Sequence, residues 1–204
     1  MKLFFLSSLL AICTSACAMG VNIPQPDGSK PVNIIFHADP EFTQLERTAI
    51  QGGADAWAEA TGGLAQISIY WDKDKSNTIC KVAACLYRHH TDDPEVVKED
   101  SEVCGFMESC VLGWVNVRAR QKLALPTENQ ELHLVVDRDG SDLPKIATHE
   151  LGHVLGLAHI PDPWAIMFPY SNNQQRGCIT QSDLSEYCRV NSCGTHKLQP
   201  CDEK

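Results

Sequence analysis

HELGHVLGLAH, residues 149–159, sets the architecture that we expect for this chain. On a helix, His149 and His153 project from one face, so both imidazoles can bind a single metal ion. Gly156 marks the end of that helix, because glycine enters the left-handed conformation without steric cost. The chain can then turn and bring in His159 as a third ligand. Three neutral imidazoles with an open fourth position describe a catalytic zinc site, whereas a structural site is closed by four protein ligands.

Glu150 lies on the flank of the same helical face. From there it can accept a proton from a zinc-bound water without binding the metal, so we assign it as the catalytic general base. The alternative is an amphipathic helix that happens to carry histidines. A bare His-Glu-x-x-His occurs often by chance, but the glycine and the third histidine at fixed offsets favour the zinc site.

These residues resemble the elongated zinc motif of the metzincin metallopeptidases, which also require a methionine turn downstream. HIPDPWAIMFP, residues 159–169, is most similar to the matrixin branch, the matrix-metalloproteinase-like peptidases. The resemblance implies that Met167 forms an apolar floor beneath the zinc histidines. It also implies that Pro169 and Tyr170 line the pocket for the substrate side chain after the cut bond. Two departures concern this pocket: Ile160 replaces the usual serine, and Tyr170 follows Pro169 without the usual intervening residue.

The resemblance implies an α+β fold: a metzincin-like catalytic domain with a twisted, mostly parallel sheet, an antiparallel edge strand and about three helices. Hydrophobic patterning agrees with it, predicting strands at 32–36, 65–71, 111–118 and 132–136, and helices at 43–60, 143–158 and 180–187. In matrixins the edge strand that 111–118 resembles stands above the cleft. An extended substrate would pair with such an edge by backbone hydrogen bonds. Residues 72–110 look irregular and do not align.

The first 18 residues are typical of an export signal, with Lys2, an apolar run and then small residues. Its apolar core is too short to remain as a membrane anchor, and no other segment is long and apolar enough to cross a membrane. Two cleavage sites are compatible with the sequence. Cleavage after Ala18 would release a secreted protein, whereas a bacterial lipoprotein signal would leave Cys17 as a lipidated first residue. We expect an exported protein, secreted or in the cell envelope, with a linker at 19–30 and a single metallopeptidase domain with a Cys-rich C-terminal tail at 31–204.

Cysteine usage agrees with export. Beyond the signal, eight cysteines remain, namely Cys80, Cys85, Cys104, Cys110, Cys178, Cys188, Cys193 and Cys201. An even number of cysteines in an exported chain favours disulfides. The alternative is a cysteine-rich zinc site, but the sequence contains no C-x-x-C pair. We predict four bridges of unassigned pairing, one set within 80–110 and another within the tail at 178–201.

Charge restricts the partners. Loss of Lys2 with the signal leaves a net charge of −10, because all 26 acidic residues remain against one fewer of the 17 basic ones. This acidic balance argues against nucleic acid, which requires a basic surface. We expect a protein or peptide substrate and a monomer.

Two further ion sites have weaker support. Asp137, Asp139 and Asp142 cluster around a turn, which suits Ca²⁺ but is equally typical of a plain Asp-Gly turn. His133 resembles a matrixin structural-zinc histidine, yet no partner ligands are evident on neighbouring strands. His89 has no spacing that recommends it. We therefore expect one catalytic Zn²⁺ and no second zinc.

The sequence as a whole predicts an exported zinc-dependent endopeptidase. Zinc would activate water and Glu150 would take its proton. The alternative is a disulfide-stapled binding protein that has kept a metzincin scaffold without proteolytic activity. Retention of Glu150 argues against that alternative, since a purely structural metal has no use for a base. Asp183, in a segment similar to the matrixin C-terminal helix, is expected to serve packing alone.

Overall fold

The structure is a computed structural model that describes residues 31–73, 79–81, 83–104, 112–117, 130–137, 142–170, 177–191, 193–194 and 197–201. The export signal and the linker predicted for residues 1–30 lie outside these ranges. Among the helices of the described part, none combines the length and the apolar character needed to cross a membrane.

In the described part of the chain, five strands form one sheet in the order β2-β1-β3-β5-β4. Their bounds are β1 Val32–Ala38, β2 Ala65–Tyr70, β3 Ala84–His89, β4 Gly113–Val117 and β5 Gln130–Val135. The β1–β2, β1–β3 and β3–β5 pairs are parallel, and β4 alone pairs antiparallel, with β5. The prediction of a mostly parallel sheet with an antiparallel edge strand is confirmed. β3 was missed because it lies in the stretch that looked irregular.

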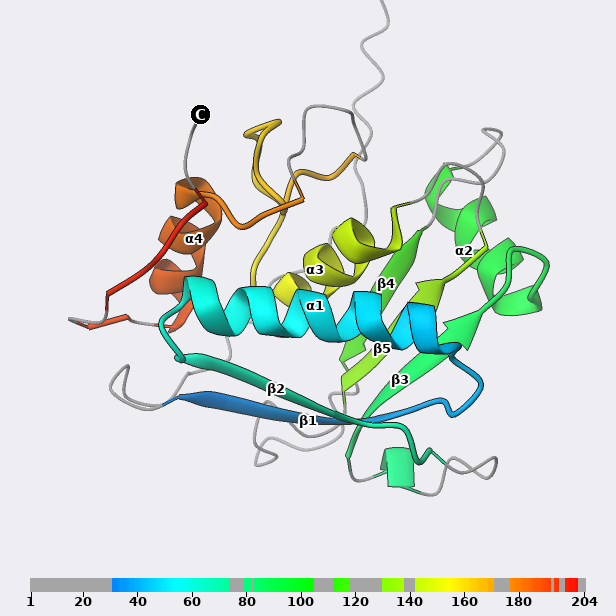
Figure 1. Cartoon of the computed structure of the whole chain (residues 1–204). Helices are drawn as coiled ribbons and strands as arrows, with labels where there is room; N and C mark the ends of the chain where they lie inside the picture. The colour runs from blue at the N-terminus through cyan, green and yellow to red at the C-terminus, as the bar shows by residue number, and fades with distance from the viewer. Residues whose placement is uncertain are drawn as a thin grey trace, which may run out of the picture.

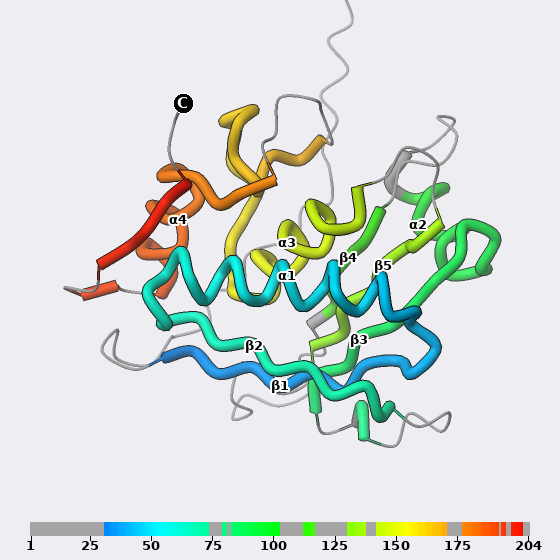
Figure 2. The backbone as a smooth tube through the Cα atoms, in the orientation of Figure 1, coloured from blue at the N-terminus to red at the C-terminus, as the bar shows by residue number. Residues whose placement is uncertain are grey.

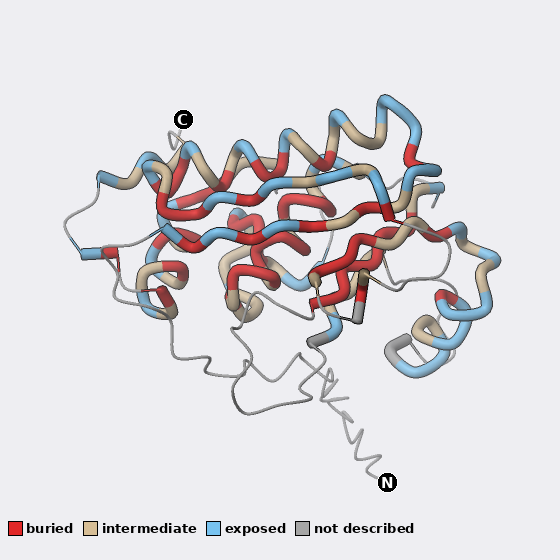
Figure 3. Tube along the Cα trace, turned by 90° about the horizontal axis from the view of Figure 1, so that it is seen from below, coloured by how far each residue is buried: buried red, intermediate tan, exposed pale blue. Residues whose placement is uncertain are grey.

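The residues that the structure describes form four α-helices, α1 Gln44–Ala60, α2 Pro94–Cys104, α3 Leu143–Val154 and α4 Gln181–Asn191, and a short 3-10 turn at Ile79–Lys81. About three helices were expected, and α2 is the addition. It is built from an acidic stretch in which Val96 is buried and its neighbours Glu95 and Val97 are exposed. Figure 3 shows how much of α2 faces solvent. So weak an apolar stripe does not predict a packed helix.

Helices α1 and α3 pack against each other over one face of the sheet (Figure 1). Thr43 and Glu46 start α1 with a reciprocal capping box, which satisfies two backbone N–H groups that the first turn leaves open. Further along, the fully buried Trp57 donates its indole N–H to the Thr148 carbonyl of α3 at 2.8 Å. This hydrogen bond positions α3, the helix that carries the histidine motif, relative to α1.

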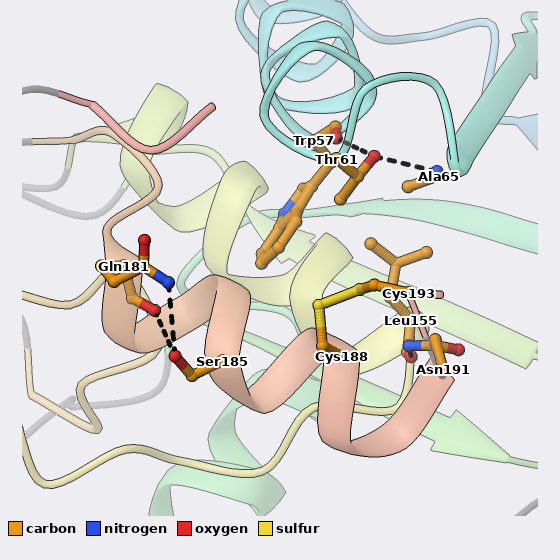
Figure 4. The surroundings of a disulfide bond; sticks show 9 residues. All are labelled: Trp57, Thr61, Ala65, Leu155, Gln181, Ser185, Cys188, Asn191 and Cys193. Atoms are coloured by element: carbon orange, nitrogen blue, oxygen red, sulfur yellow. Dashed lines mark hydrogen bonds between the residues drawn. A yellow bond between two sulfur atoms is a disulfide. The ribbon is translucent and has the colours of Figure 1, made fainter. Parts of the chain in front are cut away.

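Three disulfides lie in the described part: Cys80–Cys85, Cys178–Cys201 and Cys188–Cys193. They join cysteines within the two clusters that the sequence indicated. Cys110 and the side chain of Cys104 lie outside the described residues, so a fourth bridge stays a prediction. Figure 4 shows Cys188–Cys193 at the end of α4, where the Asn191 amide donates to the Leu155 carbonyl at 3.0 Å. The bridge thereby closes beside the end of α3.

The segment 197–201 returns to the body of the domain, and Figure 2 shows it in red beside the end of α1. The Gln199 amide donates to the Ala60 carbonyl at 2.8 Å, and the Cys201 amide to the Ile179 carbonyl at 2.9 Å. Together with Cys178–Cys201, these bonds fix the segment at two points.

Candidate active site

Local sequence determines where α3 begins and ends. Asp142 caps its start by accepting from the Lys145 amide at 3.4 Å, and Pro144 stands in the first turn, where a missing N–H costs nothing. The helix ends at Val154, and Gly156 has a φ of +89°. The left-handed glycine expected from the sequence is confirmed. It turns the chain so that His159 comes back toward the helix.

The three histidines converge through their Nε2 atoms. The Nε2 of His153 lies 3.1 Å from that of His149 and 3.1 Å from that of His159. Tetrahedral zinc with Zn–N bonds of about 2.0–2.1 Å holds its nitrogen ligands about 3.3 Å apart. The three side chains are half-buried. The arrangement therefore has the size and partial solvent access of an open metal site.

Two hydrogen bonds orient the imidazoles. The Nδ1–H of His149 donates to the Ile166 carbonyl at 2.7 Å, and the Nδ1–H of His153 donates to the Leu157 carbonyl at 2.8 Å. A proton fixed on Nδ1 leaves the lone pair on Nε2, and Nε2 is the atom that points at the common centre.

Burial also keeps the three imidazoles neutral. It lowers the pKa of His149 to about 3, with further lowering from the neighbouring His153 and His159 charges. Burial lowers the pKa of His153 to about 4, and it lowers the pKa of His159 as well. Neutral imidazoles with convergent lone pairs are the donor set that zinc prefers. The residues present thus fit the metal that the motif implies.

Glu150 lies beneath β4, almost completely buried with 6% of its surface exposed. A Cβ added to Gly113 would stand 2.9 Å from its Cγ, so the strand backbone passes directly over the side chain. Among the described residues its Oε2 has no hydrogen-bond partner, and burial raises the pKa of Glu150 to about 8. A buried carboxyl with an uncommitted oxygen is a candidate proton acceptor.

The chain after His159 forms the methionine turn. Met167 is completely buried, and its carbonyl accepts from the Ile160 amide at 2.9 Å. Its Sδ lies against Gly152 of α3, in the space that any Cβ there would take. The turn is therefore packed directly under the histidine helix.

Asp183 organises this turn from α4. Its fully buried carboxylate accepts from the amides of Ile166 and Met167, both at 3.0 Å. It also accepts from the Thr180 amide at 2.8 Å and hydroxyl at 2.7 Å. Sequence reasoning gave Asp183 a packing role only. The hydrogen bonds to the turn could not be foreseen, because they join residues that are distant in the sequence.

The substrate-pocket residues follow the turn. Pro169 and Tyr170 are both exposed, and the rings of Phe168 and Tyr170 meet edge to face with centroids 5.7 Å apart. Nothing in this arrangement tests a pocket, so that role stays a prediction.

The proposed calcium ligands are engaged with protein groups. Asp137 accepts from the Thr91 amide and pairs with the His90 ring, both at 2.9 Å. Asp142 caps α3 and lies 3.3 Å from the Lys145 ammonium. Asp139 lies outside the described residues. The calcium interpretation thus gains no support, and the plain turn accounts for the described aspartates.

A second cluster was missed from the sequence. His133, whose partners were not evident, lies with His89 and Glu95, and their donor atoms are all within 4.8 Å of one another. The three belong to β5, β3 and α2, respectively, so no short spacing in the sequence could have signalled them.

Comparison with known proteins agrees with the geometry. The family profile described as Matrixin matches residues 25–189. Matrix metalloproteinase-2 of Drosophila melanogaster is 48% identical over 48 residues, which are 23% of this chain and 6% of the relative. Matrix metalloproteinase-16 of Homo sapiens is 59% identical over 34 residues, 17% of this chain and again 6% of the relative. The matches thus span a small part of those relatives, whereas the family profile spans most of this chain. The chain belongs to the matrixin family of metallopeptidases.

Proposed function

We propose that this protein is a zinc-dependent endopeptidase that hydrolyses peptide bonds, with zinc held by His149, His153 and His159. The observation that carries the proposal is the convergence of the three Nε2 atoms, at 3.1 Å separations, one residue away from the buried Glu150. A purely structural metal would have its fourth position closed by protein.

Glu150 is the general base in this proposal. A zinc ion held by His149, His153 and His159 would supply a Lewis acid for the scissile carbonyl and for water, and its positive charge would lower the pKa of Glu150. Glu150 accepts a proton at Oε2, the oxygen without a partner, and then passes it to the leaving amine. Burial raises the pKa of Glu150 and a zinc charge would lower it, so the two effects oppose each other at the group that must both accept and release the proton. No residue becomes covalently attached to the substrate.

Strand β4 is the proposed docking edge for the substrate. It pairs with β5 on one side and, among the described residues, is the last strand of the sheet, so its other side could pair with an extended peptide. Backbone pairing favours long chains over short ones and gives little sequence selectivity. Met167 would support the histidines from below, and Pro169 and Tyr170 would line the pocket beyond the cut bond.

Export completes the proposal. The disulfides suit an oxidising compartment, which supports residues 1–18 as an export signal. We propose residues 31–204 as one domain. Secretion and a lipid anchor at Cys17 are the two forms of export that the sequence leaves open. We expect the protein to act as a monomer.

The first experiment pairs zinc content with cleavage of casein, an unstructured protein, for wild type and Glu150→Ala. We expect one zinc at the triad of both proteins and cleavage by wild type alone, abolished by a chelator. Glu99→Ala, on the partly exposed side of α2, is the matched control and should cleave normally. Zinc in both proteins with cleavage by neither would favour the alternative, a binding protein on a peptidase scaffold. Equal cleavage by wild type and Glu150→Ala would remove Glu150 from the mechanism.

A further inference from the structure

The segment 197–201 joins the end of α1 to the start of α4. The Gln199 amide donates to the carbonyl of Ala60, the last residue of α1, at 2.8 Å. It thereby satisfies a carbonyl that the end of a helix leaves open. The Cys201 amide donates to the Ile179 carbonyl at 2.9 Å, just before α4 begins, and the Cys178–Cys201 disulfide closes the same contact covalently. This bridge therefore decides whether the segment stays attached to α4.

The bridge also lies at one end of a continuous path to a histidine of the active site. Cys178 is two residues before Thr180, whose amide and hydroxyl donate to Asp183 at 2.8 and 2.7 Å. Asp183 accepts from the amide of Ile166 at 3.0 Å, and the carbonyl of Ile166 accepts from the Nδ1–H of His149 at 2.7 Å. Each step is a hydrogen bond or a short stretch of backbone, so movement at the bridge is transmitted to His149.

We propose that Cys178–Cys201 is a redox-sensitive control on the methionine turn and, through it, on the three histidines. A thiolate of a dithiol attacks one of the two sulfurs, the S–S bond breaks, and a mixed disulfide forms. The second thiol of the same molecule then displaces that cysteine. The products are two cysteine thiols and a dithiol oxidised to its disulfide, which has supplied two electrons and two protons.

Exposure selects this bridge for reduction. Of the three bridges in the described part of the chain, it is the one in which both cysteines are partly exposed. Cys80 and Cys85 have exposed fractions of 1% and 0%, and Cys193 has 8%. An attacking thiolate must reach a sulfur atom, and accessible disulfides are the ones that exchange. Reduction should therefore begin at Cys178–Cys201.

Opening this bridge frees the segment 197–201. The contacts that remain among the described residues are the backbone hydrogen bonds of Gln199 and Cys201 and the packing of the partly buried Leu198 against the core. They oppose the conformational freedom that the released segment regains. The bridge also closes a separation of 23 residues, whereas the other two described bridges each close one of 5. Its loss therefore removes the largest of the three constraints.

The first test asks which bridge opens first. The full chain would be treated with rising concentrations of dithiothreitol, its thiols alkylated with iodoacetamide, and the labelled cysteines identified by peptide mass spectrometry. Cys178 and Cys201 should be labelled at a lower dithiothreitol concentration than Cys80 and Cys85. Earlier labelling of the buried pair would overturn the proposal.

The second test asks whether the open bridge loosens the turn. Hydrogen exchange of the Ile166 and Met167 amides, which donate to Asp183, would be followed in bridged, reduced and reoxidised protein. Exchange should become at least about tenfold faster on reduction and return to its first rate on reoxidation. Unchanged circular dichroism would show that the reduced chain is still folded. Unchanged exchange after reduction would overturn the proposal.

Two double variants show whether the effect is specific to this bridge. Cys178→Ser with Cys201→Ser should exchange fast at both turn amides without any reductant. Cys188→Ser with Cys193→Ser removes the bridge at the other end of α4 and is the matched control, which should keep slow exchange. Equal acceleration in both double variants would mean a general loss of stability, and the proposed control would be wrong.

The effect on cleavage rests on the proposed function, whereas the loosening of the turn does not. Zinc retention is measured on the double variants, because the thiols of dithiothreitol themselves bind zinc. The variant without Cys178–Cys201 should retain zinc about tenfold less tightly than the control, as loss of an outer support does, and should cleave casein more slowly. If wild type binds zinc but cleaves nothing, the proposed peptidase fails, and exchange and zinc retention still decide the redox control.

Discussion

Gly113 of the edge strand lies directly over Glu150 of the histidine helix. A methyl group on Gly113 would stand 2.9 Å from the Glu150 Cγ and equally close to the His133 carbonyl. Neither neighbour can yield easily, because one is a buried side chain and the other is sheet backbone. The strand that we propose for substrate docking is therefore in contact with the residue that we propose as the base.

Gly113→Ala should accordingly impair catalysis without removing zinc. The added methyl must displace Glu150 or the strand, and a misplacement of that kind costs at least about tenfold in kcat/KM. Casein cleavage and zinc content would be measured together. Gly52→Ala, on α1 with open space around it, is the control, and it should raise stability by about 0.5–1 kcal/mol at unchanged activity. Full activity of Gly113→Ala would show that β4 can move away from Glu150 at no cost.

Gly152→Ala should destabilise the domain. The new Cβ would overlap the Sδ of Met167 and come within 3.0 Å of the Trp57 ring, in a region without free volume. Overpacking of this kind costs about 1–3 kcal/mol in the free energy of unfolding. Urea unfolding of the zinc-free protein would measure it. If Gly152→Ala and wild type have the same midpoint, the methionine turn is not packed against α3 as described.

Asp183→Asn should loosen the methionine turn. The substitution keeps the size of the side chain but replaces a carboxylate that accepts four hydrogen bonds, two of them from the amides of Ile166 and Met167. Hydrogen bonds to charged groups contribute about 1.5–3 kcal/mol each, so a loss of about 2–4 kcal/mol is expected. Urea unfolding checks it, with the exposed Ser185→Ala on the same helix as control. If Asp183→Asn loses no more stability than Ser185→Ala, the hydrogen bonds of Asp183 do not stabilise the turn.

The raised pKa of Glu150 predicts a pH dependence of stability in the zinc-free protein. Below its ordinary pKa of 4.5 the group is protonated in both states and costs nothing. As the pH rises from 4.5 to about 8, the unfolded chain ionises it while the folded chain does not, so stability falls by several kcal/mol. Glu150→Gln should therefore become more stable relative to wild type across this window. Unfolding curves at several pH values would show it, and a difference that stays flat with pH would contradict the burial described.

Local patterning predicted the elements that carry their own signals. The apolar spacing of α1, the alternation of β4 and the glycine that ends α3 are each local patterns, contained in one short stretch of the sequence. β3 and α2 were missed for the opposite reason. β3 mixes cysteine, arginine and histidine with its apolar residues, and α2 has too few buried positions to show a period. Both form because the rest of the sheet provides a surface for them.

The same division holds at the sites. The triad was predictable because its spacing lies on one helix and one turn. The pairing of His89 with His133 depends on the register of two parallel strands 44 residues apart, which no local pattern specifies. The hydrogen bonds from the methionine turn to Asp183 likewise depend on how α4 packs against the turn, which no local pattern specifies.

Residues 197–201 are held against the domain by hydrogen bonds and a disulfide. This matters if the protein cleaves extended chains, as we propose. Such an enzyme is always close to its own polypeptide, and a loose end would be the nearest available substrate. Cleavage requires backbone that can be drawn out into a strand. The bond from Gln199 to Ala60 and the Cys178–Cys201 bridge prevent this segment from being drawn out. If the protein is the proposed endopeptidase, the Cys178–Cys201 bridge would therefore make this segment a poor substrate for it, besides stabilising the fold.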